Sequence, residues 1–252
     1  MANVRFMCQN SINADDTTIT ASSENPDYPK ENLLKQNPND KWKATSSSAN
    51  LQLYNGGNAI GVNALIILNH NLTGTITLEG DNSASPVTPA YSQNISVSDD
   101  IIIYFLSSYT AYDYWDIKNL SGAGGANVEI GHIYLGQTID LDRNCTPFEP
   151  IKRDPTDFHI DRYGSIPSIE EMDQYVELPL FFGSINSGDK NHFETIRDAV
   201  GRKKWFYVCT NPGEASLHTV TYYVRMMKDW EIKPKGNAEN VWTLEMPLEE
   251  IR

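Results

Sequence analysis

The chain has 252 residues, of which 40% are hydrophobic and 21% charged, a composition typical of a globular protein rather than a disordered one. Its formal net charge of −13 argues against general nucleic-acid binding, which needs a basic face. No apolar run approaches the length of a membrane span, and Met1–Asn10 lacks the apolar core of a signal peptide. The three cysteines (Cys8, Cys145 and Cys209) are widely separated and odd in number, so we expect reduced thiols in a protein made in a cytoplasm.

The first half of the chain has the pattern of an all-β domain. Met1–Thr20 is predicted to be an arm that ends in a strand at Thr17–Thr20, where β-prone residues gather. Ser83–Ser98 is polar and is predicted to be a surface loop. Turns are predicted at Asn55–Asn58 and Gly122–Gly125. Further strands are predicted at short apolar or alternating segments: Leu51–Tyr54, Val62–Leu68, Gly74–Gly80, Ile101–Leu106, Tyr114–Ile117 and Val128–Leu135.

The stretch Ser22–Trp42 is predicted to be a long irregular loop. Its three prolines fix φ and remove backbone donors, so it is neither a regular helix nor a central strand. The loop also carries Leu33, Leu34 and Trp42, which we expect to be buried beneath it. A loop of this kind closes one end of a β-sandwich.

The same loop carries a resemblance to a known family. Asn32, Leu33, Leu34, Pro38 and Trp42 match the first-loop pattern of discoidin (F5/8 type C, galactose-binding-like) domains, Pro-Ala-x-Asn-Leu-Leu-Asp-Gly-x-Pro-x-Thr-x-Trp. The resemblance implies a galactose-binding-like β-sandwich over residues 1–145. Such domains often hold a structural calcium in this loop. Here lysine and glutamine replace the Asp-Gly of the pattern and a second lysine precedes the tryptophan, so we expect no metal.

Two features of the first domain have alternative interpretations. His70, in the break Asn69–Leu72, is either a ligand-binding side chain or a turn residue that hydrogen-bonds the loop backbone, and the structural role is favoured. The aromatic residues of Tyr109–Trp115 either fill the sandwich or form a platform for a sugar. Filling is favoured, because a platform requires exposed rings.

The proline-rich segment Asp140–Pro155 is predicted to separate the first domain from a smaller one at 146–252. The second domain is predicted to be β-rich with one packed helix, Asn191–Val200, capped by Asp189 and ended by Gly201. Strands are predicted at Tyr175–Phe182, Trp205–Cys209, Val220–Met227 and Val241–Leu248, the first being an edge strand or split at a bulge because of Pro179. The fold class is therefore mainly β.

No motif in the sequence indicates a particular enzymatic reaction. There is no nucleophile elbow, phosphate loop, dinucleotide fingerprint or zinc-protease motif, and the cysteines lack metal spacing. His159 and Asp161 form only a weak metal pair, and the adjacent acidic pairs Glu170-Glu171 and Glu249-Glu250 point to opposite faces of a strand. The basic cluster Arg202–Lys204 either caps the helix or grips an anion, with the cap favoured. We expect no catalytic residue, no cofactor and no metal ligand.

Two further segments direct the functional interpretation. Leu65–Leu72 and Glu129–Gly136 resemble strands of discoidin-like domains in phage structural proteins. This resemblance implies a non-enzymatic component of a bacteriophage tail, at the distal tail or tail tip, made in the bacterial cytoplasm and assembled into the virion. Its expected partners are other copies of itself in a ring and neighbouring tail proteins, with no nucleic acid and no membrane insertion. The alternatives are a carbohydrate-binding protein that recognises a host surface glycan and a hydrolase with an accessory sandwich.

Overall fold

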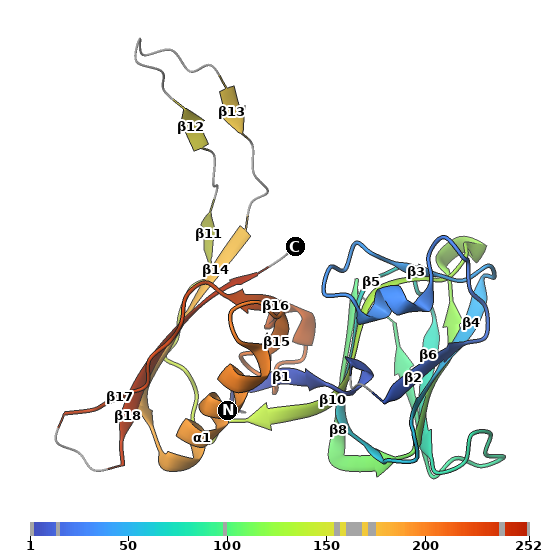
Figure 1. Ribbon diagram of the computed structural model, residues 1–252, viewed down its shortest axis with the longest axis horizontal. Coiled ribbons are helices and arrows are strands. Elements are labelled where there is room, and N and C mark those ends of the chain that lie inside the picture. The colour runs from blue at the N-terminus through green and yellow to red at the C-terminus, as the bar shows by residue number, and fades with distance from the viewer. Residues whose placement is uncertain are drawn as a thin grey trace. The chain divides into compact units, whose positions relative to one another are not determined.

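The computed structural model describes residues 3–13, 16–97, 100–153, 157–159, 168–170, 175–236 and 240–250, with 157–159 and 168–170 described by their backbone. The described chain is mainly antiparallel β with one α-helix, which confirms the predicted fold class (Figure 1). The chain divides into two compact units. Unit 1 comprises Met1–Phe6, Asp140–Ala215 and Val220–Arg252, and unit 2 comprises Met7–Ile139 and Ser216–Thr219.

Unit 2 contains the predicted β-sandwich. One sheet has five strands in the order β2 (Thr17–Ala21), β4 (Ser48–Asn55), β9 (Tyr114–Ser121), β6 (Thr75–Asp81) and β7 (Tyr91–Ser96). The other places β5 (Ile60–His70) between β10 (Glu129–Asp140) and β8 (Ile101–Tyr112), with β3 (Trp42–Lys43) also paired to β10. Short 3₁₀ turns lie at Ser11–Asn13, Ala123–Gly125 and Leu217–Thr219.

The core of unit 2 is built from the inward faces of both sheets. Leu51, Leu53, Trp115 and Ile117 come from the five-stranded sheet and pack in one cluster with residues of β5 and β10. Because successive side chains of a strand point to opposite faces, the residues between these apolar ones point away from the core. The alternation predicted for Leu51–Tyr54 is confirmed.

The Trp42 loop packs against β10. Trp42 and Leu33 are fully buried, but Leu34 is 39% exposed, so its predicted burial is wrong. The chain turns through a 3₁₀ helix, Lys30–Leu34, that can bury only one of the two leucines. The loop backbone comes so close to β10 that a Cβ on Gly131 would lie 2.0 Å from the Pro38 carbonyl oxygen.

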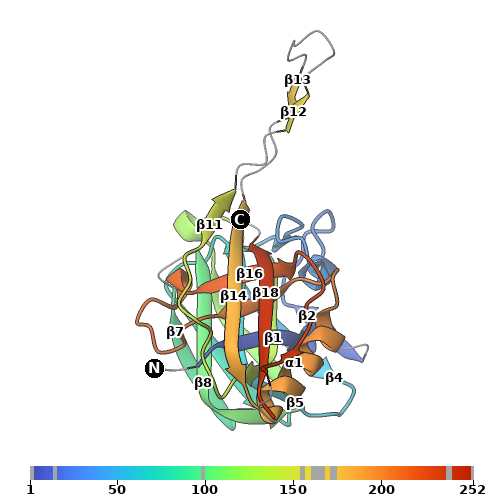
Figure 2. The same ribbon diagram turned by 90° about the vertical axis from the view of Figure 1, so that its left-hand side faces the viewer.

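Unit 1 contains a sheet and the helix. Strands β14 (Tyr175–Ile185) and β18 (Trp242–Glu250) run side by side (Figure 2). The sheet continues through β16 (Thr221–Met226) and β15 (Phe206–Cys209), with β11 (Ile151–Arg153) beyond β14 and β17 (Lys233–Pro234) paired to β18. Strand β11 pairs only with residues 175–177 of β14, so at Pro179 strand β14 has β18 as its one neighbour. Pro179 therefore occupies an edge position, where a residue without a backbone N–H is tolerated.

The helix α1 (Ser187–Val200) buries Phe193, Ile196 and Val200, as predicted. Its cap differs from the prediction: Asn186 accepts a hydrogen bond from the Asp189 backbone, and Asp189 lies buried in the first turn. Gly201 ends the helix with a φ of 54°. Just beyond it, the Lys204 ammonium donates to the Ala199 carbonyl, which supports the capping role of the basic cluster.

Two other sequence predictions are corrected. The N-terminal arm contains a strand, β1 (Arg5–Asn10), and β7 lies inside the predicted loop Ser83–Ser98.

Strands β12 (Asp157–His159) and β13 (Ser168–Glu170) pair with each other in a separate two-stranded sheet. The domain boundary at 145/146 stays a prediction.

Candidate functional site

The residues that the sequence offered as weak catalytic or metal-binding candidates do not come together in a site among the described side chains. The His159 side chain, Asp161 and the Glu170-Glu171 pair lie outside the described side chains. Glu249 is used structurally, because it accepts a charge-assisted hydrogen bond from Arg225 on the neighbouring strand. Across the part of the chain that the structure describes, no group of three or more His, Cys, Asp or Glu could hold a metal ion. No helix of that part is long and apolar enough to cross a membrane.

His70 has the structural role that the sequence favours. Its Nδ1 accepts a hydrogen bond from the Leu72 backbone at 3.1 Å, which fixes the turn after β5. Burial lowers the pKa of His70, so the imidazole is neutral at physiological pH and able to accept this bond. The side chain therefore shapes the loop.

The Trp42 loop does not fit the calcium that its family resemblance implies. Lys35 lies 3.5 Å from the Asp40 carboxylate, so a lysine ammonium is paired with an acidic oxygen of the loop. The Pro38 carbonyl accepts from Asn69, and the Asn37 side chain accepts from the Asn39 backbone. Calcium requires several free oxygen ligands and is repelled by an ammonium, so this loop is closed by hydrogen bonds instead.

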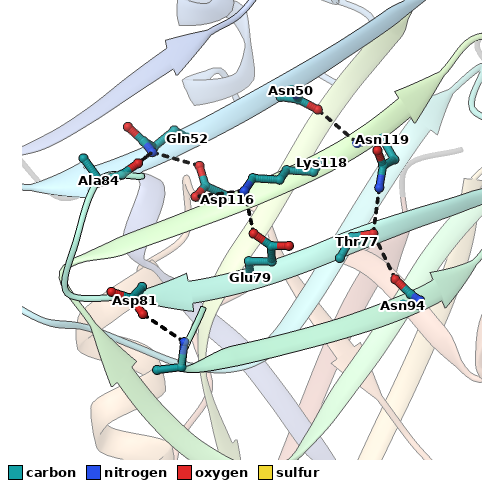
Figure 3. A network of polar contacts seen from close by, with 11 residues as sticks. Asn50, Gln52, Thr77, Glu79, Asp81, Ala84, Asn94, Asp116, Lys118 and Asn119 are labelled. Carbon is teal, nitrogen blue, oxygen red and sulfur yellow. Dashed lines mark hydrogen bonds and ion pairs between the residues drawn. The ribbon is translucent and has the colours of Figure 1, made fainter. Parts of the chain in front are cut away.

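A polar network covers the outward face of the five-stranded sheet (Figure 3). We call this surface the polar face and define it by Asn50, Gln52, Thr77, Glu79, Asp81, Asn94, Asp116, Lys118 and Asn119. The strand register places Gln52, Asp116, Glu79 and Ser92 in one row across β4, β9, β6 and β7. The row thus brings two carboxylates together from strands that are distant in the sequence.

Lys118 and Gln52 organise the two carboxylates. The Lys118 ammonium lies 2.5 Å from the Glu79 carboxylate and 4.0 Å from that of Asp116. The Gln52 amide donates to Asp116 at 2.9 Å and to the Ala84 carbonyl at 2.8 Å. The side chains of Asp116 and Glu79 are only 10% and 16% exposed, against 34% for Lys118. The carboxylates therefore lie deep in the face, with the lysine above them as the accessible cation.

A second set of hydrogen bonds extends the network along β6 and β9. The Asn119 amide donates to the Thr77 hydroxyl at 2.9 Å, and that hydroxyl donates to Asn94 at 3.0 Å. Asn119 has a φ of 59°, and its backbone N–H donates to the Asn50 side chain. These contacts hold the side-chain amides of Asn50, Asn94 and Asn119, from three different strands, in defined orientations.

The pKa values of Asp116 and Lys118 are both raised, which disfavours the charged form of the aspartate and favours that of the lysine. Burial raises the pKa of Asp116 above its ordinary value, and the nearby Glu79 adds to this, although Gln52 and Lys118 favour the ionised form. The hydrogen bond to Glu79 raises the pKa of Lys118 and keeps it charged. Asp116 is therefore the carboxylate whose charge is least compensated.

An aromatic pair adjoins this network. Tyr54 and Tyr114 are partners in the β4–β9 register, two residues from Gln52 and Asp116 on the same face. Their rings are stacked, with centroids 4.5 Å apart and 15° between the ring planes, and both residues are half-buried. The face thus combines an aromatic surface with fixed donors and acceptors. Trp115 points inward and fills the core, as the favoured interpretation of the aromatic segment predicts, but that interpretation is wrong for Tyr114, which lies on the outward face, and for Tyr109, which is 56% exposed.

The sequence predicts no residue of the polar face as a site. The available signal is the alternation of Tyr114–Lys118, in which apolar Trp115 and Ile117 separate three outward polar or aromatic residues. That alternation also describes any solvated sheet face, so it carries no information about a ligand on its own.

No family model matches the chain, and no curated protein matches it. Solved structures share its sandwich. A Clostridium perfringens protein, CpGH89CBM32-6, is 18% identical, with a TM-score of 0.41 over 51% of this chain and 99% of that one. The family 32 carbohydrate-binding module of C. perfringens NanJ, solved with galactose, is 15% identical (TM-score 0.41, covering 54% and 99%). A chitosan-binding module from Paenibacillus sp. IK-5, solved with chitotriose, is 10% identical (TM-score 0.41, covering 50% and 99%). The chain is thus similar to carbohydrate-binding modules in its fold alone.

Proposed function

We propose that this protein is a non-enzymatic glycan-binding protein and that the polar face of its sandwich holds the sugar. The observation that carries the proposal is the fixed set of carboxylate, amide and ammonium groups beside the Tyr54–Tyr114 stack. A sugar presents hydroxyl groups that both donate and accept hydrogen bonds, and an apolar C–H face that packs on aromatic rings. The polar face offers partners for both.

The rigidity of the face supports this role. Gln52, Lys118 and Asn119 are each held by side-chain hydrogen bonds to neighbouring strands. A side chain that is already ordered loses little rotamer entropy when a ligand binds, so more of the contact energy contributes to affinity. Glycan ligands gain little from apolar burial, and a preorganised surface compensates for this.

A glycan array with the fluorescently labelled protein tests the proposal. We expect binding to a restricted class of glycans, and the same class should be lost when Gln52 and Tyr114 are both replaced by Ala. A folded double variant, checked by circular dichroism, separates loss of the site from loss of the fold. Absence of binding by the wild-type protein to every glycan on the array would contradict the proposal.

A second candidate function is assembly within a bacteriophage tail, the structural role that the sequence resemblance implies. It is favoured by the β12–β13 pair, whose strands hydrogen-bond only with each other in the described chain. A lone two-stranded sheet is marginally stable in water and gains stability by packing on, or pairing with, another surface. We propose that a second copy of the chain provides that surface.

Light scattering of the wild-type protein and of a variant lacking residues 157–170 tests the assembly role. We expect a symmetric oligomer that the deletion converts to monomers. An antibody against the chain should also decorate purified tails at one level near the tip. A monomeric wild-type protein that is absent from virions would exclude the assembly role and would not bear on the proposal of glycan binding.

A further inference from the structure

We propose a separate binding site in unit 1 for a small zwitterion, a free α-amino acid, held by Lys228, Trp230 and Glu245. The proposal does not depend on glycan binding, because the polar face belongs to unit 2 and these three residues belong to unit 1. It rests on a pocket, on one buried donor without a partner, and on two opposite charges without ion-pair partners.

The pocket lies where the sheet of unit 1 is interrupted. Among the described residues, β16 pairs with β18 only at residues 248–250, and β17 lies beside β18 only at residues 242 and 243 (Figure 1). The segment between β16 and β17 does not continue this ladder. A pocket of about 380 Å³ lies at the interruption, lined by residues of that segment and of β14, β17 and β18. Its size is within the range of about 300–1,000 Å³ that is usual for small-molecule sites.

Trp230 provides a hydrogen-bond donor that the protein leaves unused. The residue is 6% exposed, and its ring packs edge-on against Phe193 of α1, with 6.3 Å between the ring centroids. Its indole N–H has no hydrogen-bond partner among the described residues, and Trp230 lines the pocket. A buried donor without a partner is costly, and an acceptor atom of a bound ligand removes that cost. The ligand therefore carries an acceptor group.

The charged side chains of the pocket define the ligand further. Asp229 and Glu231 each lie beside a basic side chain, at 3.7 and 3.6 Å. Lys228 and Glu245 also line the pocket and have no ion-pair partner in the described chain. A simple anion would be repelled by the unpaired glutamate, and a simple cation by the unpaired lysine. A ligand with one carboxylate and one ammonium compensates both charges.

The sequence and the strand register orient this ligand. Lys228 and Trp230 lie two residues apart on the same segment, so together they offer an ammonium and an N–H to the carboxylate. Glu245 is the direct partner of Phe181 in the β14–β18 register, and Phe181 is 44% exposed. A protonated amine there gains a charge-assisted hydrogen bond and attraction to the aromatic ring. The aromatic side chains of the lining also favour an apolar amino acid.

NMR titration of the isotope-labelled full chain with L-phenylalanine tests the proposal. The chain has five tryptophans, and the indole N–H signal that is missing from Trp230→Phe belongs to Trp230. We expect this signal to shift and saturate. At about pH 6, N-acetyl-L-phenylalanine lacks the ammonium and L-phenylalanine amide lacks the carboxylate. Each should bind roughly tenfold more weakly, the usual effect of losing one charge-assisted hydrogen bond.

Two variants assign the charges. Glu245→Gln should weaken L-phenylalanine to the affinity of its N-acetyl form, and Lys228→Gln should weaken it to that of the amide. The matched controls Glu149→Gln and Lys203→Gln change exposed residues outside the pocket lining and should bind as wild type does. An unmoved Trp230 signal, or equal affinity of wild type for the three ligands, would overturn the proposal. Full affinity in either pocket variant, or lost affinity in either control, would also overturn it.

Discussion

Lys118 on β9 and Glu79 on β6 form an ion pair with 2.5 Å between Nζ and Oε2, on the outward face of the sandwich. Exposed ion pairs contribute little to stability, because water screens them and long side chains lose entropy. Here the Glu79 side chain is largely buried, and Lys118 also lies near Asp116. The pair therefore holds the Lys118 ammonium in a fixed position above two carboxylates. A charged group that is already ordered loses little entropy when a ligand binds.

Gly131→Ala is expected to destabilise the sandwich by roughly 1–3 kcal/mol or more, the cost of overpacking a closely packed site. The added Cβ would lie 2.0 Å from the Pro38 carbonyl oxygen, a backbone atom that moves only if the Trp42 loop lifts away from β10. Urea unfolding measures the change. Gln137→Ala, at an exposed position of the same strand, is the control and should stay within about 0.5 kcal/mol of wild type. A stable Gly131→Ala protein would mean that the loop does not pack on β10.

Trp42→Ala is expected to cost roughly 3–5 kcal/mol, the usual range for deletion of a buried aromatic side chain. Trp42 is fully buried, and its indole N–H has no hydrogen-bond partner among the described residues. Trp42→Phe keeps a ring and removes that N–H, so it should cost clearly less than Trp42→Ala. Both values come from denaturant unfolding. A Trp42→Ala protein that unfolds like wild type but fails to bind glycan would assign the residue to a ligand site.

Acidification is expected to destabilise the sandwich through His132, which is buried on β10. Burial lowers the pKa of His132 to about 4, below its ordinary value of 6.5. Between these two values the unfolded chain binds more protons, so the free energy of unfolding falls as pH falls, by up to about 3 kcal/mol. Urea unfolding from pH 7 to pH 4 measures this slope. His132→Gln should flatten it, whereas His218→Gln, at an exposed position, should leave it unchanged. Equal slopes in wild type and His132→Gln would contradict the prediction.

Limited proteolysis is expected to cut first between Asp140 and Pro155, where Arg143 is exposed and residues 142–150 form no regular strand. Trypsin should yield two protected fragments, visible by denaturing electrophoresis. The fragments should remain associated in native gel filtration, because Phe6 of the N-terminal fragment packs against Phe193 and Phe206 of the C-terminal fragment within unit 1. Complete degradation after the first cut would contradict a two-domain organisation.

Much of the fold could be predicted because alternation and turn chemistry are local. Leu51–Tyr54 and Val62–Leu68 have strand patterns, and the structure places both in sheets. β7 could not be predicted in the same way. Only Ile95 of its six residues is buried, since it is an edge strand that pairs with β6 alone. A strand with polar residues on both sides looks like a loop in the sequence. The predicted cap of α1 is wrong because Asn186 and Asp189 are both good capping residues, and only the backbone geometry distinguishes them.

The candidate site could not be predicted because its residues come together only through strand pairing. Gln52, Glu79 and Asp116 lie on three strands that are widely separated in the sequence. The period of two predicts which face each side chain occupies, but it does not predict which strands are neighbours or how they are aligned. The burial of Asp116 likewise depends on its neighbours across the sheet, Gln52 and Glu79, rather than on any local motif.

Titration of one bound glycan against wild type, Tyr114→Ala and Tyr28→Ala decides whether the sugar lies beside the polar face. Tyr114 adjoins the polar face, whereas Tyr28 is 41% exposed on the Trp42 loop and serves as a matched aromatic control. We expect Tyr114→Ala to weaken binding roughly tenfold or more, a loss of about 1.4 kcal/mol, and Tyr28→Ala to bind as wild type does. Full affinity in Tyr114→Ala together with lost affinity in Tyr28→Ala would place the sugar at the loop end of the sandwich and contradict a site on the polar face.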